Sequence, residues 1–333
     1  MDQFIRNRYT PDILTEAMRR YEIAPDDIEK GDGFESYIYR FTRGGERFIL
    51  RITHTYRRTP ELIRGEVDWI NDLAAGGAGV ARAVPSARGE LVEEIDDGAG
   101  GRFLATAFVH AAGRPPWEVG WSPALMETYG RLIGRMHALT KKYEPGEPAW
   151  RRRVWPGDDT AEIESILSAA DPAALATYRV LEERVNRLPR DRDSYGLIHF
   201  DAHEANFFVD DDGRITLFDF DDCAYNWFAN DIAMVLFYKI SNTDDPPAVA
   251  AGFWPHFIRG YAAENTLDPA WAATIADFMK MREIDLYAVI MRSYGIGPDD
   301  AEQIPHSWTR NFMTGRRARI ADGVPYLDYE VGW

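Results

Sequence analysis

One stretch, GLIHFDAHEANFFVDDDGRITLFDFDD (residues 196–222), constrains the fold of this chain more than any other. Apolar and β-branched runs, NFFV and RITLFDF, flank an Asp-Gly turn, which is the pattern of a β-hairpin. Asn206 begins the first arm and Asp219 ends the second, so we expect both side chains at the open end of the hairpin. Asp201 lies on the loop just upstream, whereas the turn aspartates 210–212 point the other way. Local structure is therefore expected to gather three polar groups in one place.

The types and spacing of these polar groups indicate phosphoryl transfer. Oxygen ligands of this kind suit Mg²⁺, which binds one or two carboxylates together with phosphate oxygens and waters. His199, Asp201 and Asn206 have the H-x-D-x-x-x-x-N spacing of a protein-kinase catalytic loop. In that chemistry the Asp accepts the proton of the attacking hydroxyl, and the Asn binds metal. We therefore predict Asp201 as the catalytic base, with Asn206 and Asp219 as metal ligands.

Segments nearer the N-terminus supply the other parts of an ATP site in the expected order. GDGFES (31–36) is typical of a glycine-bearing turn whose backbone N–H groups can cover phosphates. The phosphate-binding candidates of this turn are Gly31, Gly33 and Ser36. Two β-rich runs joined by RGGE predict a hairpin, and Arg51 lies on its second strand, where kinases place a phosphate-pairing cation. Glu66 follows fifteen residues later on a predicted helix and is expected to orient that cation.

The distribution of patterns along the chain predicts two lobes. The first hundred residues show strand patterns and one helix, which Thr59 can cap and the glycines at 76–77 can stop. Helical patterns dominate the remainder, among them about 160–188, 228–240 and 270–293. We therefore predict an α+β, bilobal fold, with a small antiparallel β-rich lobe at residues 1–109 and a larger, mostly helical lobe at 110–333.

Composition narrows the range of partners and locations. The formal net charge is −16, which argues against nucleic acid as the main partner and is compatible with a cationic small molecule. A single cysteine, Cys223, excludes an internal disulfide and the usual multi-cysteine zinc sites. The charged N-terminus lacks an apolar signal region, and the longest apolar run, 232–238, is too short to cross a bilayer. We therefore expect a cytoplasmic protein without a membrane partner.

Five segments carry a resemblance to a known family: LRI (50–52), LIGRMHALT (132–140), HFDAHEANF (199–207), LFDFDD (217–222) and NDIAMVL (230–236). Together they make the chain similar to the aminoglycoside phosphotransferase-like kinases, which include choline, homoserine and methylthioribose kinases and a bacterial stress-response protein kinase. The similarity spans about residues 28–290. It implies a protein-kinase-like fold, ATP and Mg²⁺ as cofactors, and transfer of the γ-phosphate to a hydroxyl. It also implies that Asp231 is a structural aspartate that braces the catalytic loop.

Other residues near the motif have supporting roles or depart from the family pattern. We expect His199 and His203 to be hydrogen-bonded supports of the loop, and Asp221 is a candidate for an extra metal or substrate contact. The family usually has Gly where this chain has Phe200, and Ser36 replaces a frequent Asn. Phe200 is therefore expected to narrow or reshape the site.

The identity of the acceptor leaves several functions open. A small-molecule hydroxyl is the main hypothesis, and a protein Ser/Thr kinase of the stress-response type is the alternative. A metal hydrolase using the H-x-D-x-H cluster of His199, Asp201 and His203, and a nucleotide-binding scaffold without activity, are weaker hypotheses. Acidic side chains of the helical lobe are candidates for holding a cationic group of the acceptor, namely Glu264, Glu283 and Asp285.

Overall fold

The structure, a computed structural model, describes residues 2–33 and 35–333 and divides into two compact units. Unit 1 consists of Met1–Arg114, Lys142–Arg152 and Phe207–Asp221, and unit 2 of Pro115–Lys141, Arg153–Asn206 and Asp222–Trp333. The α+β fold class predicted from the sequence is confirmed. The predicted single boundary between residues 109 and 110 does not describe this division, because two later segments of the chain also belong to unit 1.

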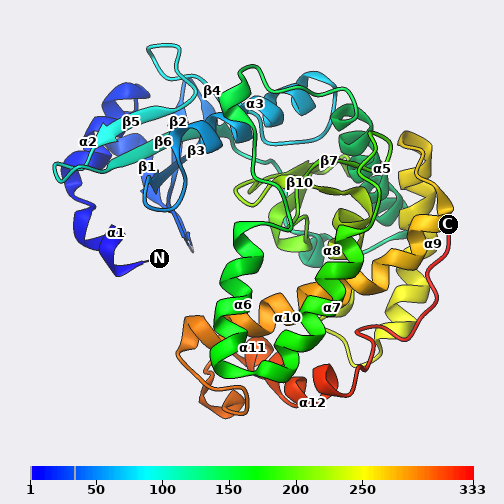
Figure 1. The fold of residues 1–333 in the computed structure, drawn as a ribbon. Coiled ribbons are helices and arrows are strands. Elements are labelled where there is room, and N and C mark those ends of the chain that lie inside the picture. The colour runs from blue at the N-terminus through cyan, green and yellow to red at the C-terminus, as the bar shows by residue number, and fades with distance from the viewer. Residues whose placement is uncertain (1, 34) are drawn as a thin grey trace. The chain divides into compact units, whose positions relative to one another are not determined.

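Unit 1 is built on an antiparallel sheet, visible in Figure 1 around the labels β1 to β6. Its strands are β1 (Ile28–Lys30), β2 (Tyr37–Arg43), β3 (Glu46–His54), β4 (Ala83–Val84), β5 (Glu93–Asp96) and β6 (Arg102–Val109). The β2–β3 hairpin turns through Gly44 and Gly45, both with positive φ, at the predicted RGGE segment. Leu50 and Ile52 of β3 face a core shared with α1 (Gln3–Arg8) and α2 (Pro11–Arg20), which the sequence patterns did not predict.

Helix α3 (Pro60–Ala75) begins and ends as its sequence predicts. The Thr59 side chain accepts a hydrogen bond from the Leu62 N–H, Pro60 occupies the first position, and Gly76 follows the last. The helix buries an apolar stripe that includes Ile63 and Val67. Glu66 is buried on the same helix, so it is not a solvated surface residue.

The hairpin of the acidic stretch forms between β8 (Phe207–Val209) and β9 (Ile215–Leu217), with Phe207 opposite Leu217. Although the predicted helical lobe contains its sequence, this hairpin belongs to unit 1. The reason is backbone pairing: Leu217 exchanges hydrogen bonds with Gly79 and Ala81, each at 2.8 Å, and Val209 pairs with Arg114. Such long-range pairing cannot be predicted from the local sequence pattern of the hairpin.

Unit 2 is mainly helical. Its helices are α4 (Pro116–Val119), α5 (Pro123–Thr140), α6 (Asp158–Ala170), α7 (Pro172–Asn186), α8 (Phe228–Ile240), α9 (Pro246–Glu264), α10 (Ile275–Tyr294), α11 (Ser307–Met313) and α12 (Arg316–Ala321). A two-stranded antiparallel ladder joins β7 (Tyr195–Ile198) to β10 (Ala224–Trp227). Helices α5 and α9 approach closely, since a Cβ at Gly130 would lie 1.9 Å from the Phe257 carbonyl oxygen, and one at Gly260 would lie 2.0 Å from that of Glu127.

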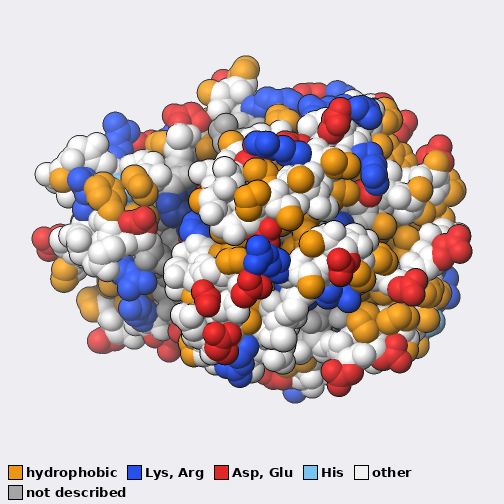
Figure 2. All heavy atoms as spheres, turned by 60° about the horizontal axis from the view of Figure 1, so that its bottom comes forward, with side chains coloured by type: hydrophobic (Ala, Val, Ile, Leu, Met, Phe, Trp, Pro, Cys, Tyr) orange, Lys and Arg blue, Asp and Glu red, His pale blue; other side chains and the backbone are white. Residues whose placement is uncertain are grey.

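No helix within the described ranges 2–33 and 35–333 is both long enough and apolar enough to cross a bilayer. On the face drawn in Figure 2, acidic and basic side chains are interspersed among apolar ones.

Candidate active site

In unit 1 the two predicted nucleotide-site residues Arg51 and Glu66 form a bidentate ion pair. Both N–O distances are 2.8 Å, and the side chains are 7% and 0% exposed, respectively. Burial opposes the charge of Arg51, but the carboxylate of Glu66 outweighs it, so the pKa of the guanidinium lies above its ordinary value. The fork of an arginine can hold a carboxylate in this way and still present its other edge to a phosphate. The structure pairs the two side chains as the sequence predicts, and the contact of Arg51 with a phosphate stays a prediction.

The predicted phosphate turn lies just before β2, and its Phe34 lies outside the described residues. The Gly31 N–H donates to the Ile38 carbonyl at 2.8 Å, which closes the turn onto β2. A Cβ at Gly33 would lie 2.1 Å from the Ser36 carbonyl oxygen, so the close approach requires glycine there. Arg57, from the loop after β3, makes an ion pair with Glu35 and thereby ties the turn to this loop.

Asp219 and Asp221 of the D-F-D motif follow β9 in unit 1. Asp219 has a left-handed backbone (φ 65°) and an exposed side chain. Asp221 lies among arginines, with its Oδ2 at 3.1 Å from Arg58 and 3.8 Å from Arg57. Burial raises the pKa of the Asp221 carboxyl, but Arg58 and then Arg51 outweigh it, and the pKa falls to about 2. Asp221 thus forms ion pairs with neighbouring arginines, and the sequence did not predict these contacts.

In unit 2 Asp231, on α8, lies beneath the catalytic loop. Its Oδ1 accepts the Phe200 N–H at 2.8 Å, and its Oδ2 accepts the His199 N–H at 3.3 Å. Nε2 of His137, on α5, lies 3.0 Å from the same Oδ2, and its Nδ1 lies 2.9 Å from the Tyr261 hydroxyl. Because Asp231 can only accept, His137 donates from Nε2 and accepts from Tyr261. These contacts agree with the bracing role expected of Asp231.

Phe200, the departure from the family pattern, adopts a left-handed backbone (φ 70°). This conformation costs a non-glycine residue energy, which explains why glycine suits the position. The aromatic ring is buried, and its centroid lies 5.5 Å from that of Trp155. The side chain therefore packs into unit 2, and its burial offsets the unfavourable backbone conformation.

Asp201 has partners on both carboxylate oxygens. Oδ1 lies 2.9 Å from Nη2 of Arg282, on α10, and Oδ2 lies 3.3 Å from Nε2 of His203. The His203 Nδ1 accepts the Ala205 N–H, so Nε2 carries the proton and donates to Asp201. Burial raises the pKa of the Asp201 carboxyl, but His203 and Arg282 outweigh it and hold the pKa well below its usual range. Asp201 is therefore ionised at neutral pH, as a proton acceptor requires.

Asn206 ends the loop in a buried position. Its Nδ2 donates to the Asp201 carbonyl at 2.9 Å and lies 3.4 Å from Asp201 Oδ2, which leaves Oδ1 as the outward acceptor. Within the part of the chain that the structure describes, no donor contacts this Oδ1. An amide oxygen of this kind is a ligand that Mg²⁺ accepts, and so is a carboxylate such as that of Asp219, when phosphates and waters complete the shell of the ion. The residues present therefore fit the metal that the motif implies.

The support predicted for His199 and His203 takes a specific form. His199 is buried, and its Nδ1 accepts the Asp201 N–H at 3.2 Å. Among the residues described, no group of three His, Cys, Asp or Glu side chains is arranged to hold a metal ion. The arrangement therefore gives no support to a hydrolase with an H-x-D-x-H metal cluster, and both histidines accept hydrogen bonds from N–H groups of the loop.

Two candidates for binding a cationic acceptor group are paired within the protein. Glu283 is buried between Arg316, in a short ion pair, and Lys280 at 2.8 Å. Glu264 lies 3.6 Å from Arg131.

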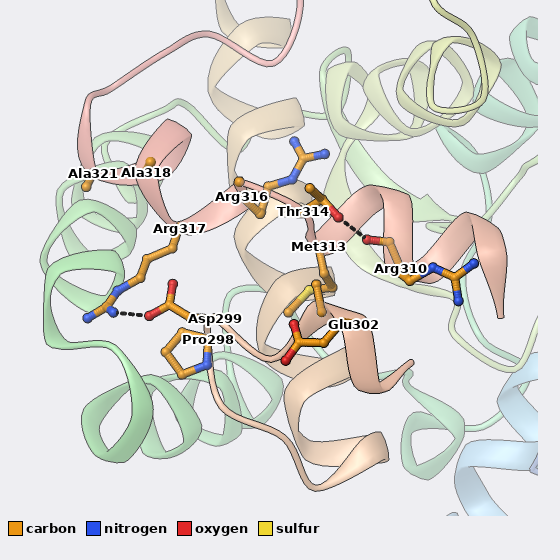
Figure 3. Close-up of a pocket in the computed structure, with 12 residues that line it drawn as sticks. Pro298, Asp299, Glu302, Arg310, Met313, Thr314, Arg316, Arg317, Ala318 and Ala321 are labelled. Atoms are coloured by element: carbon orange, nitrogen blue, oxygen red, sulfur yellow. Dashed lines mark hydrogen bonds and ion pairs between the residues drawn. The ribbon is translucent and has the colours of Figure 1, made fainter. Parts of the chain in front are cut away.

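A pocket of about 540 Å³ borders α11 and α12, and Figure 3 shows the side chain of Arg317 paired with that of Asp299 at this pocket. None of the predicted site residues lines this pocket.

Sequence reasoning missed Arg282, Tyr238 and the link from Tyr261 to His137. Arg282 is eighty-one residues from Asp201, on a helix whose sequence contains several charged residues, so spacing alone could not identify it. His137 lies within LIGRMHALT, a segment that the sequence marks as part of the family pattern without assigning it a partner. Only the packing of α5 against α9, and of α8 against α10, brings these side chains together.

Comparison with known proteins supplies independent support. Residues 29–273 match the phosphotransferase enzyme family. The amicoumacin kinase of Bacillus subtilis (strain 168) is 35% identical over 322 residues, which cover 96% of this chain and 94% of that protein. A solved structure of the amicoumacin kinase hAmiN in complex with AMP-PNP, Ca²⁺ and Ami has a TM-score of 0.90 at 33% identity and covers 99% of this chain and 98% of its own. An aminopropanol kinase structure, at 20% identity and a TM-score of 0.70, shows the same fold over 96% of this chain and all of its own.

These similarities confirm the kinase predictions. The enzyme class, a phosphotransferase with an alcohol group as acceptor, agrees with the relatives, and so does the use of ATP with a divalent metal ion. The protein-kinase-like architecture is confirmed by solved structures that cover almost the whole chain. The chain belongs to the phosphotransferase enzyme family.

Proposed function

We propose that this chain phosphorylates a hydroxyl group of amicoumacin, or of a compound closely similar to it, with ATP as the donor. The observation that carries the proposal is identity of 35% with an amicoumacin kinase over nearly the full length of both chains. Unit 2, which contains Asp201 and the predicted acceptor-binding region, is included in that match, because the similarity covers 96% of this chain. The reaction takes place in the cytoplasm, where ATP is supplied, and it needs neither a nucleic acid nor a membrane partner.

In this proposal Asp201 acts on the acceptor. Its ionised carboxylate orients the hydroxyl and accepts its proton while the oxygen forms a bond to the γ-phosphorus. The bond between that phosphorus and the bridging oxygen breaks at the same centre, and ADP leaves with the bonding electrons. The Asp201 carboxylate is suited to this because its pKa lies well below neutrality and its position is set by several hydrogen bonds.

The nucleotide is handled mainly by residues of unit 1. Arg51, oriented by Glu66, contacts the phosphates, and the turn with Gly31, Gly33 and Ser36 covers them with its backbone. Asn206 and Asp219 would each offer an oxygen ligand to a divalent ion, which when bound would neutralise charge on the phosphates. The remaining catalytic contribution is positioning, since phosphoryl transfer needs little covalent help from the protein.

A direct test incubates the purified chain with amicoumacin, ATP and Mg²⁺ and follows ADP release and the phosphorylated product by mass spectrometry. Asp201→Asn should lower transfer to a small residual rate, Asp219→Ala should abolish it, and both variants should keep the fold. Asp211→Asn, at the exposed tip of the same acidic stretch, is the matched control and should retain full activity. Full turnover by the Asp201→Asn variant would refute the assignment of the base.

The same assay identifies the acceptor if amicoumacin is not the substrate. A hydroxylysine kinase of Bos taurus is 25% identical over 252 residues, which cover 68% of this chain and 65% of that protein. Hydroxylysine, amino alcohols and aminoglycosides therefore complete the panel, and a lysate with labelled ATP tests for a protein acceptor. ADP release with one of these and none with amicoumacin would replace the proposed substrate and leave the kinase assignment standing.

A further inference from the structure

We propose that Arg282 is a positioning residue for phosphoryl transfer, because it holds Oδ1 of Asp201 and thereby presents Oδ2 to the acceptor hydroxyl. The inference rests on the proposed role of Asp201 as the catalytic base. Arg282 lies on α10, beyond the last residue, 273, of the family match. None of the five segments that carry the family resemblance contains Arg282.

The two oxygens of Asp201 are held with different strength. Nη2 of Arg282 lies 2.9 Å from Oδ1, the length of a charge-assisted hydrogen bond. The contacts of Oδ2 with His203 Nε2, at 3.3 Å, and with Asn206 Nδ2, at 3.4 Å, are longer. An incoming hydroxyl can replace these weak contacts at low cost, whereas displacement of the guanidinium would break a strong one. Oδ2 is therefore the oxygen that accepts the proton.

Tyr238 fixes Arg282 in turn. The Tyr238 hydroxyl accepts from Nε of Arg282 at 3.1 Å and, in a short contact, from Nη2. The guanidinium carbon also lies 5.3 Å from the centroid of the Tyr238 ring, within the range of a cation–π contact. Tyr238 is on α8, which packs against α10 and also carries Asp231. Helix α8 therefore supports the loop backbone through Asp231 and the Asp201 side chain through Tyr238 and Arg282.

The side chains of Asp201 and Arg282 are each 21% exposed, so the pair is accessible and is not a sealed core contact. Two roles are conceivable for a cation beside a base, and they predict opposite results. As an inhibitor that occupies the base, Arg282 would lower the rate, and its removal would raise turnover. As a positioning residue it raises the rate, because a catalytic group misplaced by about 1 Å can cost about 100-fold.

The test uses the full chain with amicoumacin and Mg²⁺–ATP and measures kcat, the KM for ATP and thermal unfolding for each variant. Arg282→Gln should lower kcat about 100-fold with the KM for ATP unchanged. Arg282→Lys restores a cationic donor without the second contact to Tyr238 and should recover part of the loss. Tyr238→Phe, which keeps the ring, should show a smaller decrease than Arg282→Gln.

Arg292→Gln is the matched control, because Arg292 lies on the same helix and pairs with Glu162 on the surface. Its kcat should equal that of the unsubstituted chain. A double-mutant cycle adds a readout that general destabilisation would not reproduce: in the Asp201→Asn background, Arg282→Gln should cause no further loss. If Arg282→Gln alone does not fold, the Arg282→Lys and Tyr238→Phe variants decide the question by the same comparison.

Three outcomes are distinguishable. An Asp201→Asn variant with only a small residual rate, together with a fully active or faster Arg282→Gln, overturns the inference and leaves the proposed function intact. Equal losses for Arg282→Gln in both backgrounds also overturn it, since Arg282 would then act independently of Asp201. A fully active Asp201→Asn overturns the proposed function itself.

Discussion

Nε2 of His137 lies 3.0 Å from Oδ2 of Asp231, and both side chains are completely buried. The contact joins α5 to α8, and Asp231 in turn accepts the backbone N–H groups of His199 and Phe200. A buried carboxylate with three donors is stabilising only while every donor remains, because each unpaired buried polar group carries a desolvation penalty. This carboxylate therefore holds the start of the catalytic loop through two of its backbone N–H groups.

Asp231→Ala should destabilise unit 2 strongly. It leaves two loop N–H groups and His137 without their acceptor, and breaking a buried pair in this way costs about 3–5 kcal/mol. We expect a large decrease in the urea midpoint together with loss of activity. Asp222→Ala is the control, because Asp222 pairs with Arg153 at a half-exposed position, and it should shift the midpoint little. Equal midpoints for the two variants would contradict the bracing role.

Stability should decline on acidification because of His137. Burial lowers the pKa of His137 below its ordinary value, and the hydrogen bond to Asp231 opposes this without cancelling it. Below a pH of about 6.5 the unfolded chain binds a proton that the folded chain does not, so the folded state loses up to about 1.4 kcal/mol per pH unit until the folded pKa is reached. Urea unfolding between neutral pH and pH 5 measures this slope. In His137→Gln the slope should be shallower, and an unchanged slope would exclude His137 as its source.

Glycine is usually more destabilising than alanine, but the left-handed backbone of Phe200 predicts the opposite order of stability for Phe200→Gly and Phe200→Ala. Both Phe200→Ala and Phe200→Gly lose the packing against Trp155, which costs about 3–5 kcal/mol. Glycine alone relieves the unfavourable φ, so Phe200→Gly should be more stable than Phe200→Ala by about 1 kcal/mol. Chemical unfolding of both variants is the measurement. An alanine variant at least as stable as the glycine variant would contradict the left-handed conformation.

Substitutions in the Arg51–Glu66 pair should affect nucleotide binding and stability to different extents. In Glu66→Gln the guanidinium keeps its position less firmly, and we expect the KM for ATP to rise about tenfold with a smaller change in kcat. Arg51→Ala should raise the KM further and also lower the unfolding temperature, because it leaves Glu66 buried without its partner. Arg47→Ala, at an exposed position on the same strand, is the control and should change neither quantity.

The sequence was most informative about features that depend on neighbours in the chain. The hairpin at 207–217, the helix capped by Thr59 and the order of Arg51 and Glu66 all follow from periodicity, turn residues and spacing. It was less informative where a side chain has a plausible local role. Glu283 is an ordinary helix acid in the sequence, yet the structure buries it between two cations and so removes it as an acceptor-binding group.

The sequence by itself determined the fold class, the enzyme family and the candidate residues Asp201, Asn206 and Asp219. These follow from residue type and from short spacings, because hydrogen-bond rings and side-chain periodicity act over a few residues. Only the tertiary structure decided which partners those residues have. Arg282 meets Asp201 across 81 positions of sequence, and His137 meets Asp231 across 94, because helices pack through faces whose pairing no local pattern encodes.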